Sequence, residues 1–319
     1  MRKSLLFVPS CLCLACATPA RLTAEQMTSS PPKRLAVASL EPRTVLTVSG
    51  VELALHDGDP SGAKPPIMCL HAIGHGGRDF AAFERAFGAD YRIITLDWPG
   101  QGASGPDPKP AEPQRYLELL EGVVDALQLR DVVVLGNSIG GSVAIRYAAS
   151  HPKNVRAVLL TDSAGLDANP GGFFPGLVIG HYERKMHAGV EGDPGFKDWF
   201  RAWYQEVLVT EEARAQRDAI VDSAYEIAPV LEQAWASFAR ADSDVRPLAR
   251  KLSMPVFVGW AKNDGVVRWS RSREAVEQIP NVQVHLYDAG HAAFLETPKP
   301  FNDDVRRFLL ELKAPAQGR

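Results

Sequence analysis

The sequence predicts a sharp turn from a strand into a helix in the middle of this chain of 319 residues. An apolar run at 132–135 is followed by Gly136-Asn137-Ser138-Ile139-Gly140-Gly141 and then by a helical stretch at 142–150. Such a turn crowds the positions two before and two after its central residue, and here both are glycine, Gly136 and Gly140. The turn would therefore hold Ser138 clear of the backbone, as a serine nucleophile beside a base requires.

A glycine-rich turn between a strand and a helix also binds phosphate in dinucleotide-binding folds. That fingerprint requires glycine where Ser138 stands, and it belongs to the first strand and helix of the fold. Here at least three predicted strands precede the turn. The motif therefore favours a nucleophile, and the rest of the chain has to supply an acid, a histidine and a second oxyanion donor.

Short apolar runs and helical patterns alternate along most of the chain. Two β-like runs at 44–48 and 51–55 surround Ser49-Gly50 and predict an antiparallel hairpin. Later runs are typical of strands covered on both faces: 67–71, 92–96, 132–136, 155–161, 255–260 and 282–287. Helical patterns separate most of them: 79–87, 113–127, 142–150, 270–279 and 300–312. This order predicts a mostly parallel sheet flanked by helices, with right-handed crossovers.

The interval from about 166 to 250 breaks the alternation. It contains helix-like segments at 196–208, 211–224 and 229–239 but no convincing strand. We therefore expect a helical insertion between the sixth and seventh major strands.

The first twenty residues resemble a secretory signal peptide. Arg2 and Lys3 precede an apolar run from 5 to 15, which is too short for an ordinary transmembrane helix, and small residues follow it. Cys16 resembles the lipidated cysteine of a bacterial lipoprotein, although Cys13 replaces the aliphatic residue usual three positions earlier. We expect an exported protein, periplasmic or secreted, with a lipid anchor at Cys16 as the alternative to ordinary cleavage.

Composition narrows the classes of protein to which this chain could belong. The hydrophobic content of 45% suits a large core, and the net charge of −3 gives no basic surface for a nucleic acid. Residues 21–43, rich in Ala, Thr, Ser and Pro, are expected to form a flexible linker. Cys69 alone lies beyond the leader, within a predicted strand, so a disulfide framework is excluded and a buried inert thiol is expected.

From about residue 44 to 312, the chain resembles the α/β-hydrolases, a superfamily of esterase-like serine hydrolases. The turn around Ser138 resembles the family's nucleophile elbow. The resemblance implies an α/β-hydrolase core at 44–165 and 251–319, with a helical cap at 166–250, preceded by the signal peptide (1–20) and the linker (21–43). It also implies a catalytic triad that needs no metal or organic cofactor.

Two loops match the family's remaining triad positions. His291 lies in Gly290-His291-Ala292, after the last predicted strand, where the family's loop carries the catalytic histidine. Asp264 follows the strand at 255–260, and the order Ser138, Asp264, His291 is the family's order of nucleophile, acid and histidine. Asp264 would orient the imidazole and stabilise its protonated form. A turn aspartate before glycine is its structural alternative.

The segment His71-Ala72-Ile73-Gly74 resembles the family's oxyanion loop, with Ala72 in place of the usual glycine. The backbone N–H groups of Ile73 and Ile139 would then form the oxyanion hole. His71 would brace the loop. Asp97, in a loop resembling the family's Asp-x-Pro-Gly-x-Gly-x-Ser motif, is expected to be structural.

His75 lies four residues after His71, a spacing that would suit a metal pair on a helix. The intervening Gly74 indicates a loop instead, so we expect no metal site and place His75 at the border of the pocket. In the expected cap, we take Phe173, Phe174 and Trp203 as pocket candidates, because a helical cap can enclose an apolar acyl or aromatic group.

The resulting hypothesis is an exported serine hydrolase that cleaves carboxylic esters of small, apolar acyl substrates through an acyl-enzyme. The same machinery serves lactones and thioesters. A second hypothesis is a carbon–carbon bond hydrolase of the meta-cleavage-product type, which both the elbow and Ser163-Ala164-Gly165-Leu166 resemble. Two features depart from that subfamily: Ala292 replaces an aromatic residue, and Ala72-Ile73-Gly74-His75 replaces its Gly-Gly-Pro-Gly loop. A third hypothesis is a non-catalytic, ligand-binding protein with the hydrolase fold.

Overall fold

A computed structural model of the chain describes residues 27–28, 40–167 and 173–313. The expected signal peptide, with Cys13 and Cys16, lies outside these residues, as does most of the expected linker. Within that linker, Met27 and Thr28 pair with Leu46 and Val45 as a short strand. No helix in the described ranges is long and apolar enough to cross a membrane.

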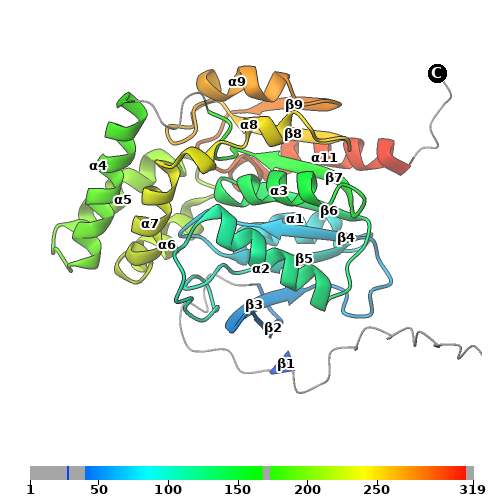
Figure 1. Ribbon diagram of the computed structural model, residues 1–319, viewed down its shortest axis with the longest axis horizontal. Helices are drawn as coiled ribbons and strands as arrows, with labels where there is room; N and C mark the ends of the chain where they lie inside the picture. Colours follow the sequence, from blue (N-terminus) through cyan, green and yellow to red (C-terminus); the bar gives the residue numbers. More distant parts are fainter. Residues whose placement is uncertain (1–26, 29–39, 168–172, 314–319) are drawn as a thin grey trace, which may run out of the picture.

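One twisted sheet runs through the molecule, with strands in the order β1-β2-β3-β5-β4-β6-β7-β8-β9 (Figure 1). The hairpin strands β2 and β3 and the pair β3 and β5 are antiparallel, whereas every pair from β5 to β9 is parallel. The strands are β1 (Met27–Thr28), β2 (Arg43–Val48), β3 (Val51–Asp57), β4 (Pro66–Leu70), β5 (Arg92–Leu96), β6 (Val132–Asn137), β7 (Val155–Thr161), β8 (Val256–Ala261) and β9 (Val282–Tyr287). The predicted, mostly parallel α/β fold is confirmed.

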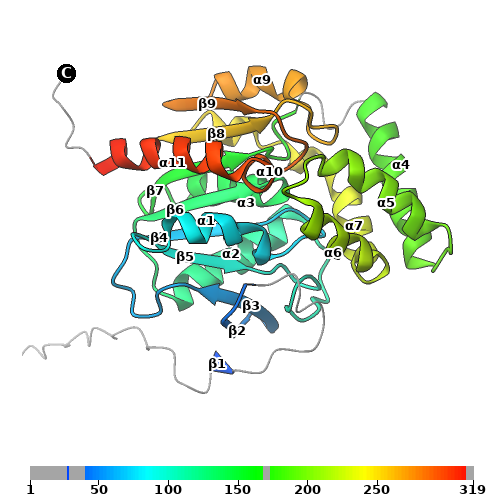
Figure 2. The same cartoon turned by 180° about the vertical axis from the view of Figure 1, so that it is seen from behind.

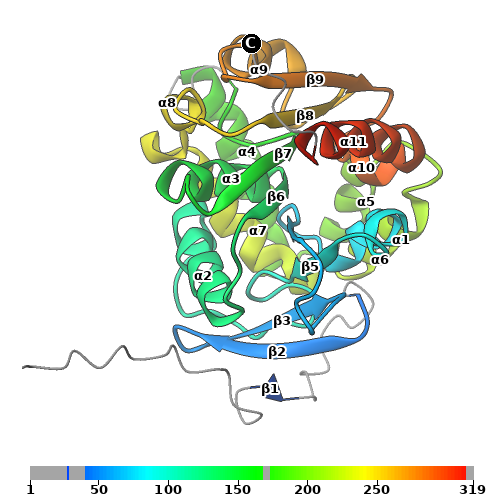
Figure 3. The same cartoon turned by 90° about the vertical axis from the view of Figure 1, so that its right-hand side faces the viewer.

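Helices cover both faces of the sheet. Figure 3 shows α2, α3 and α8 on one face and α1, α10 and α11 on the other, and Figure 2 shows α1 and α11 in front of the strands when the molecule is seen from behind. These helices and the remaining core elements are η3 (Gly77–Phe80), α1 (Ala81–Phe87), α2 (Pro113–Ala126), α3 (Ile139–Ser150), α8 (Arg246–Ala249), α9 (Trp269–Glu277), α10 (Ala293–Glu296) and α11 (Pro298–Lys313).

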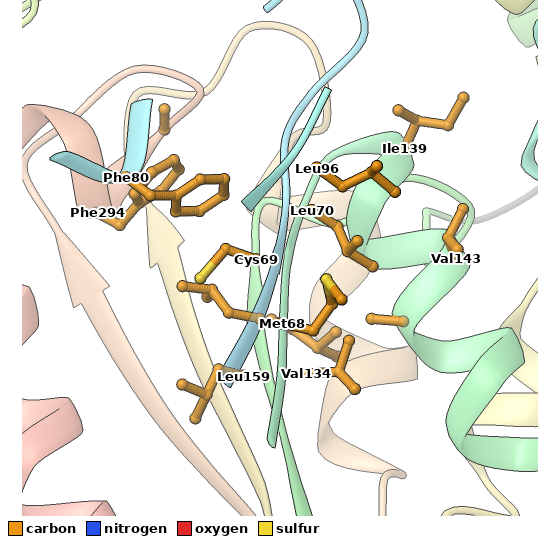
Figure 4. Close-up of a cluster of buried hydrophobic side chains, with 14 of the residues drawn as sticks. Met68, Cys69, Leu70, Phe80, Leu96, Val134, Ile139, Val143, Leu159 and Phe294 are labelled. Atoms are coloured by element: carbon orange, nitrogen blue, oxygen red, sulfur yellow. The ribbon is translucent and has the colours of Figure 1, made fainter. Parts of the chain in front are cut away.

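The central strand β4 shows how the two layers are held. Its side chains alternate, so Met68 points towards Val143 on α3, whereas Cys69 points towards Phe80 and Phe294 on the opposite face (Figure 4). All five side chains are at most 1% exposed. Burial of each such apolar side chain contributes roughly 1.5–3 kcal/mol. Cys69 is a free, buried thiol as expected, and its burial raises its pKa well above the ordinary value.

Residues between β7 and β8 form the expected insertion, after the sixth strand counted from β2. Its helices gather at one end of the sheet (Figure 1). They are α4 (Phe173–Val190), α5 (Phe196–Val207), α6 (Arg214–Asp222) and α7 (Ala224–Phe238), followed by the short turn η4 (Ala241–Ser243). Aromatic rings pack between them, with Tyr182 stacked on Trp235 at 4.5 Å between centroids. We call α4–α7 the inserted helices.

Several elements differ from the sequence prediction. Helix α4 was not predicted, because Pro175, Gly176 and Gly180 obscure its pattern, although a proline is tolerated in a first turn. Helix α7 begins at Ala224 and carries Pro229 inside it rather than at its start. Helix α3 begins at Ile139, directly after Ser138, where two glycines lowered the apparent helix propensity.

Candidate active site

Ser138 occupies the turn between β6 and α3 in a strained backbone conformation, with φ 53° and ψ −119°. The glycines around it are required by close backbone contacts. A Cβ at Gly136 would lie 2.4 Å from the carbonyl oxygen of Gly140, and a Cβ at Gly140 would lie 2.2 Å from the carbonyl oxygen of Leu70. The backbone therefore has the tight geometry that the sequence predicted for this turn.

Asp264 and His291 meet beyond the ends of β8 and β9. The Nδ1 atom of His291 lies 2.9 Å from Oδ2 of Asp264, and both side chains are buried. The other oxygen of Asp264 accepts the N–H groups of Val266 and Val267, at 2.7 and 3.0 Å. Burial lowers the pKa of His291, but the carboxylates around it, Asp264 first and then Asp162 and Glu296, together outweigh burial, so the net pKa is raised. The pair is thus built to hold one imidazole orientation.

The backbone of His291 is fixed from two sides. Its N–H donates to the carbonyl oxygen of Val207, at the end of α5, over 2.7 Å. Its carbonyl oxygen accepts the side-chain amide of Asn137, the residue before Ser138, over 3.0 Å. The loop Gly290-His291-Ala292, which we call the histidine loop, is therefore hydrogen-bonded both to the turn that carries Ser138 and to the inserted helices.

Two buried carboxylates that sequence reasoning did not single out also hold this loop. Asp162, directly after β7, accepts the N–H groups of Ala261 at 2.8 Å and Ala293 at 3.2 Å, so it links the end of β8 to the residues after His291. Glu296 accepts the N–H of Gly290 at 2.8 Å with one oxygen and that of Val209 at 2.6 Å with the other. The sequence signal that singled out Asp264, an acidic residue just beyond a buried strand, also applies to Asp162.

Among the residues that the structure describes, the predicted oxyanion amides have no competing acceptor. Ile139 is the first residue of α3, where helix N–H groups lack intrahelical partners. Ile73 is in the loop after β4, and Gly74 beside it donates to Gln101 Oε1 at 2.6 Å. Within the described ranges, the N–H groups of Ile73 and Ile139 make no hydrogen bond. Both are thus available to bind an anionic oxygen.

Two cavities meet at Ser138. The inner cavity is lined by Ile73, Ser138 and His291 together with side chains of the inserted helices. The outer cavity also reaches Ser138 and contains Arg268 and Arg271. Trp235, Phe238 and Val266 line both. No hydrogen bond joins Ser138 to His291 in the described ranges, a contact that in unliganded enzymes often tightens only with substrate.

The pocket candidates divide into two groups. His75 and Trp203 line the inner cavity beside Ser138. The side chains of Phe173 and Phe174 lie outside the described residues. No cluster of three or more metal-ligating side chains occurs in the described ranges, and His75 instead contacts Asp79.

His71 and Asp97 are structural, as the sequence suggested. His71 is fully buried; its Nδ1 donates to the carbonyl oxygen of Ala72 over 2.6 Å and its Nε2 accepts the N–H of Trp98 over 3.0 Å. Burial lowers the pKa of His71 to about 4, so the ring is neutral. Asp97 accepts the N–H groups of Gly77 and Ala103. Both side chains fix the loops beside the site.

The chain belongs to the alpha/beta hydrolase family, whose sequence profile matches residues 67–304. It is similar to 2-hydroxy-6-oxononadienedioate/2-hydroxy-6-oxononatrienedioate hydrolase 2 of Pseudomonas putida, with 26% identity over 269 residues that cover 81% of this chain and 92% of the relative. The family predicted from the sequence is confirmed, and the chain is a hydrolase.

Solved structures show the same architecture. The enol-lactonase from Burkholderia xenovorans LB400 has a TM-score of 0.69 and 20% identity, over 83% of this chain and 99% of that one. A thermophilic esterase from Thermogutta terrifontis also has a TM-score of 0.69 and 20% identity, over 85% of this chain and 99% of the esterase. At these identities the likeness shows the fold alone.

Proposed function

We propose that this hydrolase cleaves carboxylic esters, with Ser138 as nucleophile, His291 as base and Asp264 as the residue that orients His291. The observation that carries the proposal is the 2.9 Å contact between His291 and Asp264, with the same imidazole lining a cavity beside Ser138. An orienting carboxylate fixes the histidine tautomer so that Nε2 is free to accept a proton.

The reaction proceeds through two acyl transfers. His291 takes the proton of Ser138 as its oxygen attacks the ester carbonyl, and the Ile73 and Ile139 amides stabilise the resulting oxyanion. The leaving alcohol receives the proton from His291. Water, activated by the same histidine, then attacks the acyl-enzyme and releases the acid. Loss of one oxyanion donor in such a site costs about 3–4 kcal/mol of transition-state stabilisation.

The two cavities suggest where the acyl and alcohol parts of the substrate bind. The inner cavity is walled by Trp203, Leu231 and Trp235, and it lies beside both Ile73 and His291. The outer cavity includes exposed side chains such as Val178. The acyl group stays on Ser138 while the alcohol leaves, so we assign the acyl group to the inner cavity and the alcohol to the outer one. The inserted helices then act as a cap over a small, mostly apolar acyl group.

Replacement of the nucleophile tests this proposal. A Ser138→Ala protein should hydrolyse p-nitrophenyl acetate and butyrate at least about 10⁴-fold more slowly than the parent, because removal of the attacking atom disables the triad. Circular dichroism and the melting temperature serve as controls for folding. A well-folded variant that hydrolyses these esters as fast as the parent would sink the proposal.

Active-site labelling separates an enzyme from a passive binding protein with the same fold. A fluorophosphonate should label the parent stoichiometrically and should fail to label Ser138→Ala or His291→Ala, since it reacts with an activated serine. Lactones and thioesters belong in the same substrate panel, because the triad serves them equally. Equal labelling of parent and variants would favour the binding-protein hypothesis.

A second candidate is carbon–carbon bond hydrolysis, and two observations favour it. The curated relatives are named for hydrolysis of dienedioates and trienedioates, which carry two carboxylates. In this chain the outer cavity beside Ser138 contains Arg268 and Arg271. Neither lies within ion-pair distance of a described carboxylate, although Asp167 in the same cavity interacts electrostatically with Arg271. Guanidinium groups suit carboxylates, because they donate in a planar fork.

A coloured dienone-acid substrate distinguishes the two candidates. If the second candidate is right, the parent bleaches this substrate with a kcat/KM above that for p-nitrophenyl butyrate, and Arg271→Ala lowers only the former. Ester hydrolysis without bleaching supports the first candidate.

A further inference from the structure

A second histidine–carboxylate pair lines the same cavity as Ser138. His75, in the loop after β4, places Nδ1 2.6 Å from Oδ2 of Asp79 on η3, with the two side chains 1% and 0% exposed. His75 lines the inner cavity together with Ser138 and His291. The proposed mechanism does not use this pair.

Stabilisation of the loop is a weak explanation for the burial of this pair. Burying two ionisable groups costs desolvation energy, and a well-packed apolar pair of similar volume is often as stable. The other oxygen of Asp79, Oδ1, is buried without a hydrogen-bond partner in the described ranges. A carboxylate only accepts, so His75 donates its Nδ1 proton to it. In the neutral form of the ring this leaves Nε2 as an acceptor, and Nε2 has no hydrogen-bond partner among the described residues.

Tyr204 supplies a complementary donor. Its ring lies 5.9 Å from the His75 ring between centroids, and it lines the same cavity. Burial raises its pKa, so the phenol keeps its proton. Within the described ranges its hydroxyl makes no hydrogen bond. An acceptor and a donor thus lie near each other in a cavity whose other walls include Ile73, Val207 and Leu231.

We infer that His75 and Tyr204 form a polar subsite for a hydroxyl group on the acyl part of the substrate. A hydroxyl satisfies both partners at once, because it donates to Nε2 of His75 and accepts from the phenol of Tyr204. The substrate class is then a hydroxyacyl ester, with its hydroxyl group held away from the scissile carbonyl. This inference rests on the proposed function, since it assigns the inner cavity to the acyl group.

The test compares two matched esters, p-nitrophenyl butyrate and p-nitrophenyl 3-hydroxybutyrate. The parent should prefer the hydroxy ester in kcat/KM by at least about fivefold, the worth of one net hydrogen bond. Tyr204→Phe and His75→Phe should each reduce that preference to about one. Tyr225→Phe is the matched control: this tyrosine of α7 donates to the carbonyl oxygen of Asp193, outside the cavity, and should leave the preference unchanged.

If His75 and Tyr204 have a purely structural role, the variants lose kcat/KM for both esters to the same degree and the preference stays constant. That result would overturn the subsite. A parent that hydrolyses both esters equally would overturn it too. If the parent hydrolyses neither ester, the proposed function fails instead. Calorimetric titration of Ser138→Ala with the two esters then still measures the preference without catalysis, and equal binding rejects the subsite.

Discussion

Asp162 shows how one buried carboxylate influences the candidate triad. It is fully buried at the end of β7, and its burial, together with the nearby Asp264 charge, raises its pKa to about 7. The positive charge of His291, the N–H of Ala261 and the Thr161 hydroxyl act in the opposite direction. In return, the negative charge of Asp162 raises the pKa of His291. Asp162 and His291 therefore influence each other's protonation.

We predict that Asp162→Asn moves the acid limb of the kcat/KM profile to lower pH. His291 accepts a proton only when neutral, so activity falls as it becomes protonated. The neutral amide no longer stabilises the imidazolium, so the pKa of His291 falls and the active form persists to lower pH. Rates of p-nitrophenyl butyrate hydrolysis from pH 5 to 9 give the measurement.

The control for this variant is Asp288→Asn. Asp288 lies three residues before His291 but is 81% exposed and paired with Lys262, so solvent screens its charge. Its replacement should leave the limb in place. An unmoved limb in Asp162→Asn would show that Asp162 acts on the loops alone.

At the scale of elements, the turn from β6 into α3 depends on close backbone packing against β4. The sequence identified the need for glycine at positions 136 and 140 from the turn alone. At Gly136 the neighbouring atoms belong to the turn itself, to Gly140 and Gly141. At Gly140 the sequence did not identify what fills the space, because the neighbouring atoms belong to Leu70 and His71, about seventy residues earlier. Local crowding can be predicted from a motif, whereas the contacting partner depends on how the sheet assembles.

Gly140→Ala should destabilise the protein by about 3 kcal/mol or abolish soluble expression. The added Cβ would lie 2.2 Å from the Leu70 carbonyl oxygen and 2.9 Å from that of His71, and backbone atoms of a central strand cannot move aside. Urea unfolding measures the change.

Gly176→Ala is the matched control, because a Cβ at Gly176 on α4 meets no atom within 4 Å. The free energy of unfolding of this variant should equal that of the parent or exceed it by up to about 1 kcal/mol, because alanine favours a helix. Equal stability of both variants would contradict the packing argument.

At the scale of the whole molecule, the fold brings distant residues to one edge of the sheet. Ser138, Asp162, Asp264 and His291 follow β6, β7, β8 and β9, and the carboxyl ends of parallel strands share an edge. The inserted helices lie at the same end and complete the inner cavity with Trp203 and Trp235.

From the expected signal peptide we predict where the whole chain is located in a cell. We propose that the protein is exported, because Arg2, Lys3 and the apolar run at 5–15 have the pattern of a signal peptide. The full chain expressed in a bacterial host should be recovered from the periplasm or medium, shortened by about twenty residues in its intact mass. A Cys16→Ala variant that loses membrane association would indicate the lipid anchor. Full-length protein retained in the cytoplasm would contradict export.

The sequence by itself determined the alternating architecture, the turn at Ser138 and the order of Ser138, Asp264 and His291, because strand periodicity, glycine and motif order are local properties. Tertiary structure decided that Asp162 and Glu296 hold the histidine loop and that His75 pairs with Asp79 in the cavity beside Ser138. Those contacts depend on the register of separate strands and on the placement of the inserted helices. A short-range pattern does not encode either, since both are set by packing between segments far apart in the chain.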